Sequence, residues 1–325
     1  DRGLTRAPRL WRVRAERVVL ATGAIERPLT FENNDRPGIM SAEAAAEYLG
    51  RYGVLVGQTL ALLSNNTATE RVAERLSAAG AHVKALDATR GPARPFGGRR
   101  LEGIELARRR THADIVLVSG GHTPTVHLWR HAGGRLGWDE EIAAFRPAEG
   151  PDWLAVAGAV NGADALDHAL DEARALALGR PAPRHRAGYA VTPLWPDPLA
   201  PGRRWIDFQN DVTAKDIALA HRENYASVEH LKRYTTLGMG TDQGKTSNIA
   251  GLAAMASLAE ATIPDTGTTT FRPPYTPQPL ELYRGSATGQ DFAAPKRLVL
   301  EPRHREAGAR LRVYGGTLRP AWYGA

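Results

Sequence analysis

The stretch "RVVLATGAIERPL" (residues 17–29) decides the fold class of this 325-residue chain. Val18 to Leu20 are branched and apolar, which predicts a short buried strand. The strand runs into Thr22 and Gly23, and a glycine at this point lets a ligand approach the backbone closely. The stretch therefore predicts an α/β fold in which small residues end the strands beside a ligand.

A βαβ unit is predicted between residues 60 and 87. Residues 60–63 and 82–86 are apolar strands, and residues 67–79 between them have the pattern of a helix that ends at Gly80. Asp87 stands where such a unit places an acid for a ribose.

The turn of this unit is "SNNTAT" (residues 64–69), which has no glycine. Asn66 tolerates the left-handed conformation, but the β-branched Thr69 would hinder close packing of the helix on the strand. We therefore favour a structural βαβ unit over a dinucleotide site at this turn.

Two later segments also end in small residues: "ADIVLVSGGHTP" (residues 113–124) and "WLAVAGAVNG" (residues 153–162). The second leads into a periodic helix closed by Gly179, and such a helix points its N-terminus at a cofactor. Three histidines lie nearby, at His122, His127 and His131. No carboxylate follows at a metal-ligand spacing, so we expect core or surface histidines and no metal site.

Composition limits the possible functions. No apolar run approaches the roughly 20 residues of a membrane span, so no membrane contact is expected. The absence of cysteine excludes disulfides and cysteine-ligated clusters and fits a reducing cytoplasm. The net charge of +7 is scattered among acids, so no nucleic-acid partner is expected. The chain has no initiator Met, and we expect it to be part of a longer protein.

The stretch "YTTLGMGTDQGKTSN" (residues 234–248) has the glycines and the lysine of an anion-binding turn. It is not a Walker A loop, because the gap from Gly240 to Gly244 is too short and no apolar strand precedes it. What this turn holds is therefore a central question.

These stretches resemble the α subunits of heterotetrameric sarcosine oxidase. The matching residues run in order along almost the whole chain: 18–29, 33–40, 118–128, 157–162, 207–217, 227–248 and 271–277. Members of that family begin with a ferredoxin-like segment and a glycine-rich dinucleotide turn, and end with a folate-binding aminomethyltransferase-like domain. The resemblance implies three parts: residues 1–195, a partial FAD/NAD(P)-binding α/β domain; residues 203–262, a small, mainly helical domain; and residues 271–325, a linker and the start of the folate domain.

The small domain resembles domains that bind a 2Fe–2S cluster through four cysteines, as in bacterioferritin-associated ferredoxins. The four positions fall here at Asp207, Gln209, Asp242 and Ser247. None is a thiolate, so the resemblance implies an iron–sulfur fold that has lost its cluster. We also expect Thr213, with Asp216, and Ser227 to cap two helices, and Gly238 to end the second.

The resemblance implies cofactors and partners as well. The remaining wall of an NAD site would be formed by Thr22, Gly23, Gly158 and Asn161. An FMN shared with the β subunit would be contacted by Thr241, Gln243, Gly244, Lys245 and Thr246. In this interpretation Lys245 supplies a charge for a phosphate, and the backbone of residues 240–244 and the Thr246 hydroxyl complete the cradle. FAD belongs to a partner subunit, tetrahydrofolate to the C-terminal domain, and β, γ and δ subunits are the expected partners.

The implied reaction is oxidative demethylation of sarcosine, a small amine, to glycine with hydrogen peroxide and either formaldehyde or 5,10-methylenetetrahydrofolate. No residue of this chain is assigned as acid, base or nucleophile. Two alternatives stay open. One is the α subunit of an opine, hydroxyproline or glycine dehydrogenase, which usually retains the cluster cysteines. The other is a non-catalytic scaffold subunit, which the glycine-free turn at residues 64–69 favours.

Overall fold

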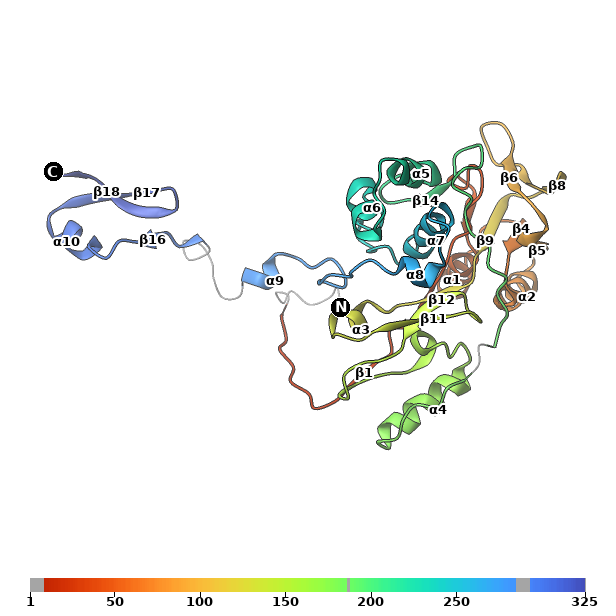
Figure 1. Ribbon diagram of the computed structural model, residues 1–325, viewed down its shortest axis with the longest axis horizontal. Helices are drawn as coiled ribbons and strands as arrows, with labels where there is room; N and C mark the ends of the chain where they lie inside the picture. The colour runs from red at the N-terminus through yellow and green to blue at the C-terminus, as the bar shows by residue number, and fades with distance from the viewer. Residues whose placement is uncertain (1–8, 186–187, 285–292, 325) are drawn as a thin grey trace. The chain divides into compact units, whose positions relative to one another are not determined.

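The computed structural model describes residues 9–185, 188–284 and 293–324. Its contacts define two compact units, one of residues 15–276 and one built from the described parts of residues 1–14 and 277–325 (Figure 1). The predicted first and third parts of the chain each include residues outside the described ranges, namely 1–8, 186–187, 285–292 and 325.

A parallel four-stranded sheet with the order β3-β9-β4-β5 organises the first half of the 15–276 unit. Its strands are β3 (Ile39–Ser41), β4 (Thr59–Ser64), β5 (His82–Asp87) and β9 (Ile115–Ser119). Strand β4 has five consecutive buried residues, as expected of a central strand covered on both faces. The strands predicted at residues 60–63 and 82–86 are confirmed.

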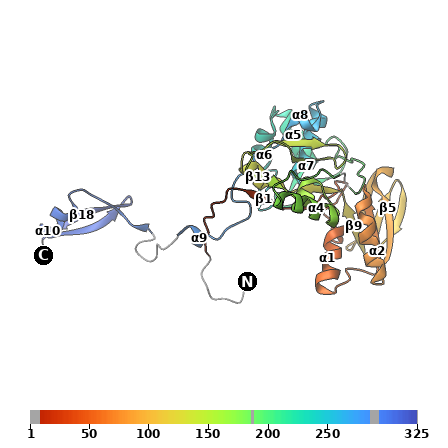
Figure 2. The same cartoon turned by 90° about the horizontal axis from the view of Figure 1, so that it is seen from below.

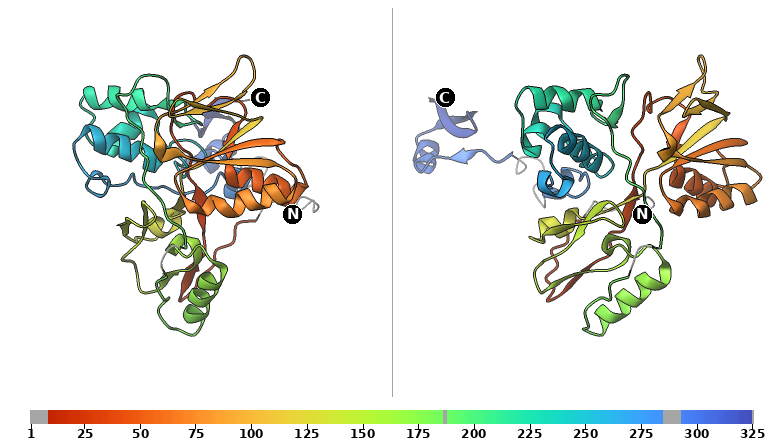
Figure 3. Two further views of the ribbon diagram at one scale, coloured as in Figure 1. Left: turned by 90° about the vertical axis from the view of Figure 1, so that its right-hand side faces the viewer. Right: turned by 45° about the vertical axis from the view of Figure 1, so that its right-hand side comes forward.

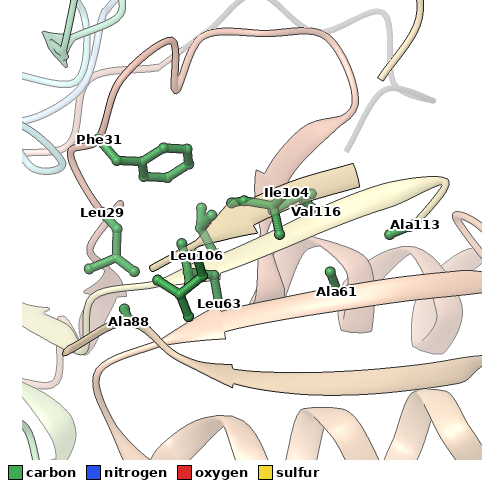
Figure 4. Packing of buried hydrophobic residues seen from close by; sticks show 10 residues of the cluster. Leu29, Phe31, Ala61, Leu63, Ala88, Ile104, Leu106, Ala113 and Val116 are labelled. Carbon is green, nitrogen blue, oxygen red and sulfur yellow. The ribbon is translucent and has the colours of Figure 1, made fainter. Parts of the chain in front are cut away.

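Different elements cover the two faces of this sheet. Helices α1 (Ala42–Tyr52) and α2 (Glu70–Ala78) lie side by side on one face (Figure 2). An antiparallel meander of β6 (Ala93–Phe96), β7 (Gly103–Leu106) and β8 (Arg109–His112) covers the other. Leu60 and Leu62 pack toward the helices, whereas Leu63 packs with Ile104 and Leu106 of the meander (Figure 4). This alternation follows the two-residue period of a strand.

The rest of the α/β half consists of small sheets and helices. They are β1 (Val18–Leu20) parallel to β13 (Leu154–Val156), β2 (Ala24–Glu26) antiparallel to β10 (His122–Pro124), β11 (Leu136–Asp139) antiparallel to β12 (Ala144–Pro147), α3 (His127–His131) and α4 (Leu166–Ala177). Three short 3-10 turns are η1 (Thr67–Thr69), η2 (Ala88–Arg90) and η3 (Gly158–Asn161).

Strand β1 forms where the sequence predicts it, but the prediction that it is buried is wrong. Val19 exposes 46% of its surface. The physical reason is that β1 forms a two-stranded sheet with β13, and the face of this small sheet on which Val19 lies is partly open to solvent.

The second half of the unit is mainly helical, as predicted for residues 203–262 (Figure 3). Its elements are β14 (Trp205–Asp207), β15 (Val212–Thr213), α5 (Ala214–Arg222), α6 (Val228–Thr235), α7 (Asn248–Leu258) and α8 (Ile263–Thr266). Helix α7 is the central one, because its first nine residues are buried. Residues of α5, α6 and α7 form one core with Ile206, Val212 and Leu237.

The predicted caps of these helices are confirmed at their N-termini. The Asp216 carboxylate accepts hydrogen bonds from the N–H and hydroxyl of Thr213, and the Ser227 hydroxyl accepts one from the His230 N–H. The prediction that Gly238 ends the second helix is wrong. Helix α6 ends at Thr235, and Thr236 takes the left-handed conformation with φ of 64°. Positive φ is uncommon for threonine, and the Thr236 carbonyl oxygen accepts a tertiary hydrogen bond from the Asn210 side chain at 3.2 Å.

The other unit contains α9 (Glu281–Arg284), α10 (Glu301–Glu306) and a small sheet. The sheet has the order β16-β18-β17, with β16 at Lys296–Arg297, β17 at Ala309–Tyr314 and β18 at Thr317–Tyr323. In the part of the chain that the structure describes, no helix has the length and apolar character needed to cross a membrane.

Candidate cofactor-binding sites

The four positions that correspond to cluster ligands lie together in the helical half. The Asp207 carboxylate is 1% exposed and accepts hydrogen bonds from the N–H groups of Gln209 and Gly238 at 2.9 and 2.7 Å. It also accepts the Ser247 hydroxyl at 3.4 Å. The side-chain oxygen of Gln209 accepts the Asp242 N–H at 3.3 Å. A continuous set of hydrogen bonds therefore joins these four residues.

The turn at residues 240–246 holds the carboxylate of its own Asp242. This side chain accepts hydrogen bonds from the Gly244 N–H at 2.9 Å and the Thr246 hydroxyl at 2.8 Å. The Thr241 hydroxyl donates to Gln209 at 3.0 Å. An internal carboxylate thus lies where a turn rich in N–H donors would place an anionic ligand. The Gly244 N–H and the Thr246 hydroxyl, two of the groups expected to complete a phosphate cradle, are therefore already engaged.

Lys245 leaves this turn toward the segment that contains Tyr275. Its ammonium group donates to the carbonyl oxygens of Asp242 and Tyr275 at 3.1 and 3.3 Å, and lies 4.3 Å from the centre of the Tyr275 ring. Burial lowers the pKa of Lys245, and the charge of Asp242 opposes this shift. Because an ammonium group has three donors, one N–H remains for an anion.

The carbonyl of Gln243 connects the turn to a buried histidine. His127 is 3% exposed, its Nε2 lies 3.2 Å from this carbonyl oxygen, and its ring lies 4.0 Å from that of Phe271. Nε2 must therefore carry the proton, since a carbonyl only accepts. Burial lowers the pKa of His127 to about 4. A neutral imidazole thus forms part of the wall of a cavity of about 30 Å³ that Lys245 also lines.

Replacing Gly244 with alanine should lower the free energy of unfolding by about 1–2 kcal/mol, measured by urea denaturation. Gly244 has φ of 72°, and an added methyl group would meet the side chain of Asn248. Gly53→Ala is the control, because Gly53 is left-handed with φ of 65° but has open space around it. Equal losses in the two variants would contradict the role of the Asn248 contact.

The four residues expected to line an NAD site are brought to neighbouring strand ends. Thr22 follows β1, and its hydroxyl donates to the carbonyl of Thr125 at 2.7 Å. Gly158 and Asn161 follow β13. The Gly158 N–H and the Asn161 side-chain amide both donate to the carboxylate of Glu172, at 2.7 and 2.8 Å. Glu172 is fully buried in α4.

Open space remains beside two of these residues. A side chain added at Gly23 would have no neighbour within 4 Å, and one added at Gly158 would meet only Ala169 at 3.8 Å. A pocket of about 430 Å³ also reaches Ala159 and Gly162, next to the predicted residues. These glycines therefore leave room for a ligand to approach the backbone.

The glycine-free turn at residues 64–69 is closed by another part of the chain. The Thr67 N–H donates to the carbonyl of Ala190 at 3.1 Å, the Thr67 hydroxyl accepts the Ala190 N–H at 3.0 Å, and Asn66 forms a bridge to Val191. Asn66 does not use the left-handed conformation that it could tolerate, since its φ is −147° and its ψ is 158°. Pairing with Val191 requires this extended backbone.

A histidine–carboxylate pair borders the pocket of about 430 Å³. His122 Nε2 lies 2.6 Å from Glu43 Oε1, and Tyr189 packs edge-on against the His122 ring. Burial alone would lower the pKa of His122, but the hydrogen bond and charge of Glu43 outweigh it and the pKa is raised. A wider pocket of about 860 Å³ is lined by Glu43 of α1 and by Thr246 of the turn.

The sequence interpretation missed the roles of Glu172 and Asp242. Glu172 had a detectable signal, because it lies on the same helical face as Ala169 and Leu176, where an apolar residue is expected. The family resemblance marks Asp242 only as the counterpart of a cluster cysteine, and the sequence gives no signal that its side chain fills the turn.

Comparison with known proteins decides the relationship of the chain. Residues 201–286 match the family described as the sarcosine oxidase A3 domain. The chain is 38% identical to the sarcosine oxidase alpha subunit from Rhizobium meliloti (strain 1021), over 97% of this chain and 36% of that protein. It is 33% identical to the sarcosine oxidase alpha subunit from Corynebacterium sp. (strain U-96), over 97% of this chain and 38% of that protein.

The chain is similar to sarcosine oxidase α subunits over nearly all of its own length. The resemblance inferred from residues 18–29 through 271–277 is therefore confirmed. The chain spans little more than a third of the length of these α subunits. It is also 26% identical to an opine oxidase subunit from Rhizobium meliloti (strain 1021), over 82% of this chain and 75% of that protein.

A solved structure supports the fold class. The crystal structure of L-proline dehydrogenase from P. horikoshii matches with a TM-score of 0.68 and 21% identity, over 82% of this chain and 58% of that chain. This likeness concerns the fold alone. Together with the A3-domain match, it confirms the predicted α/β fold followed by a small, mainly helical domain.

Proposed function

We propose that this chain is part of the α subunit of a flavin-dependent sarcosine oxidase. The observation that carries the proposal is the 38% identity to a sarcosine oxidase α subunit over 97% of the chain. The proposed reaction is the oxidation of sarcosine to glycine, hydrogen peroxide and either formaldehyde or 5,10-methylenetetrahydrofolate. The proposed assembly contains β, γ and δ subunits, with FAD on a partner and tetrahydrofolate on a C-terminal domain. The proposed parts of the chain remain residues 1–195, 203–262 and 271–325.

An FMN shared with the β subunit is the cofactor proposed for the turn at residues 241–246. The geometry fits it in one respect, because Lys245 keeps an N–H that a phosphate oxygen can accept. The turn itself fits less well, since Asp242 engages Gly244 and Thr246. We therefore assign the phosphate contact to Lys245, and give Thr241, Gln243, Gly244 and Thr246 the role of holding the turn that carries it.

NAD is proposed for the wall formed by Thr22, Gly23, Gly158 and Asn161. The open space beside Gly23 and Gly158 supports this assignment. The buried carboxylate of Glu172 accepts hydrogen bonds from Gly158 and Asn161, so we assign it the role of fixing the shape of this wall.

Lys245→Met should weaken flavin retention about tenfold in a complex co-expressed with a β subunit, because a charge-assisted hydrogen bond contributes about 1.5–3 kcal/mol. Methionine keeps an unbranched side chain without the charge, and Lys245→Arg, which keeps the charge, should retain more flavin. Flavin content is read from the absorbance spectrum of the purified complex. If the flavin is covalently held, its reduction potential and rate of reduction replace occupancy as the measurement.

A complex without flavin would contradict the proposed function itself. A flavin-containing complex in which Lys245→Met changes neither occupancy, potential nor rate would contradict only the assignment of Lys245. The turn would then have only a structural role, which favours the alternative of a non-catalytic scaffold subunit.

The second candidate is the α subunit of an opine, hydroxyproline or glycine dehydrogenase. The match to the opine oxidase subunit, which covers 75% of that protein, favours it. The lower identity of 26% and the absence of cysteine at residues 207, 209, 242 and 247 weigh against it. Turnover of sarcosine against an opine by the purified complex separates the two candidates.

A further inference from the structure

A separate pocket of about 270 Å³ lies on the helical half, between α6 and the segments 238–243 and 271–273. Its size is near the lower end of small-molecule sites, which begin at roughly 300 Å³. The charged side chains in its wall are Glu229, Lys232 and Arg233 of α6 and Arg272 of the later segment. Lys245 does not line it, although Gln243 of the neighbouring turn does.

Glu229 holds the two walls of this pocket together. One carboxylate oxygen accepts the Thr270 N–H at 2.5 Å, and the other pairs with Arg233 at 3.3 Å. The first contact fixes the segment that carries Arg272 against α6. The second contact engages Arg233. Glu229 is therefore fixed in the pocket wall, and its negative charge is paired with the positive charge of Arg233.

Lys232 and Arg272 are the cations that remain. Within the described residues, neither side chain forms a salt bridge with a carboxylate. Lys232 is half-buried, and burial together with the charges of Arg272 and Arg233 lowers its pKa despite the attraction of Glu229. Two like charges that line one pocket favour an anion between them, because it relieves their repulsion.

We propose that this pocket binds a phosphate group, with Lys232 and Arg272 as its ligands. Arginine presents a planar pair of donors to two phosphate oxygens, and lysine adds a point charge. The exposed side chain of Met239 and the polar side chain of Gln243 line the same pocket. They offer contacts to an organic group attached to the phosphate.

Inorganic phosphate is the probe for the first experiment, titrated into the full 325-residue chain by isothermal calorimetry at low ionic strength. We expect saturable binding that weakens as salt is added. Lys232→Gln and Arg272→Gln should each weaken it about three- to tenfold. Lys215→Gln, which removes an exposed lysine of α5 outside the pocket, is the matched control and should leave binding unchanged.

The pKa of Lys232 gives a second measurement, by NMR of isotope-labelled lysine side chains. Phosphate should raise the pKa of Lys232, and the side-chain NMR signal of Lys215 should not move on addition of phosphate. Glycerol 3-phosphate tests the source of the phosphate: tighter binding than inorganic phosphate supports a phosphorylated small molecule, and equal binding supports the free ion. Binding that does not saturate, or that is equal in all three variants, overturns the proposal.

Discussion

Replacing Asp207 with alanine should lower the free energy of unfolding by about 3–5 kcal/mol, because several buried donors would lose their acceptor at once. The carboxylate accepts the N–H groups of Gln209, Asn210 and Gly238 and the hydroxyl of Ser247. Because it is 1% exposed, water cannot replace it without rearrangement of the turn. The measurement is urea denaturation followed by the far-UV signal of helices α5 to α7.

Asp197→Ala is the control for this prediction. Asp197 is also an aspartate that accepts a backbone N–H, from Leu199 at 2.9 Å, but it is exposed. Its replacement should cost no more than about 1 kcal/mol, since water takes over the lost hydrogen bond. A loss at Asp207 as small as that at Asp197 would show that the four joined positions do not hold the helical half together.

Acidification should destabilise the protein through His127, by up to about 3 kcal/mol between pH 6.5 and pH 4. Burial lowers the pKa of His127 from 6.5 to about 4, so the unfolded chain takes up this proton at a higher pH than the folded chain does. Stability from this group is therefore present above pH 6.5 and is lost as the pH falls toward 4. His127→Gln should remove that part of the pH dependence, as measured by urea unfolding at pH 7 and pH 4.

His230→Gln is the matched control, because His230 lies exposed on α6. Carboxylates also titrate in this range, so the test is the difference between each variant and the wild-type chain. The loss of unfolding free energy from pH 7 to pH 4 is compared between His127→Gln and His230→Gln. An equal loss in the two variants would contradict the destabilising effect expected from protonation of the buried His127.

The sequence alone determined part of the local structure. Apolar runs and the residues that end them located β4, β5 and β9, since strand formation follows from a repeating pattern and its boundaries. Capping residues located the starts of α5 and α6, because a cap acts within one turn of its helix. The motifs between these elements also revealed the resemblance to sarcosine oxidase α subunits.

The tertiary structure decided which polar groups are free. The turn at residues 240–246 has the composition of an anion site, yet its donors hold Asp242 and Gln209. The turn at residues 64–69 is closed by residues 190–192. The N–H of Gly158 donates to the carboxylate of Glu172 in helix α4. A donor's partner depends on which distant segment packs against it, and no local pattern records that. Burial depends on the same packing, and so Val19 is exposed in a strand whose sequence predicts a core position.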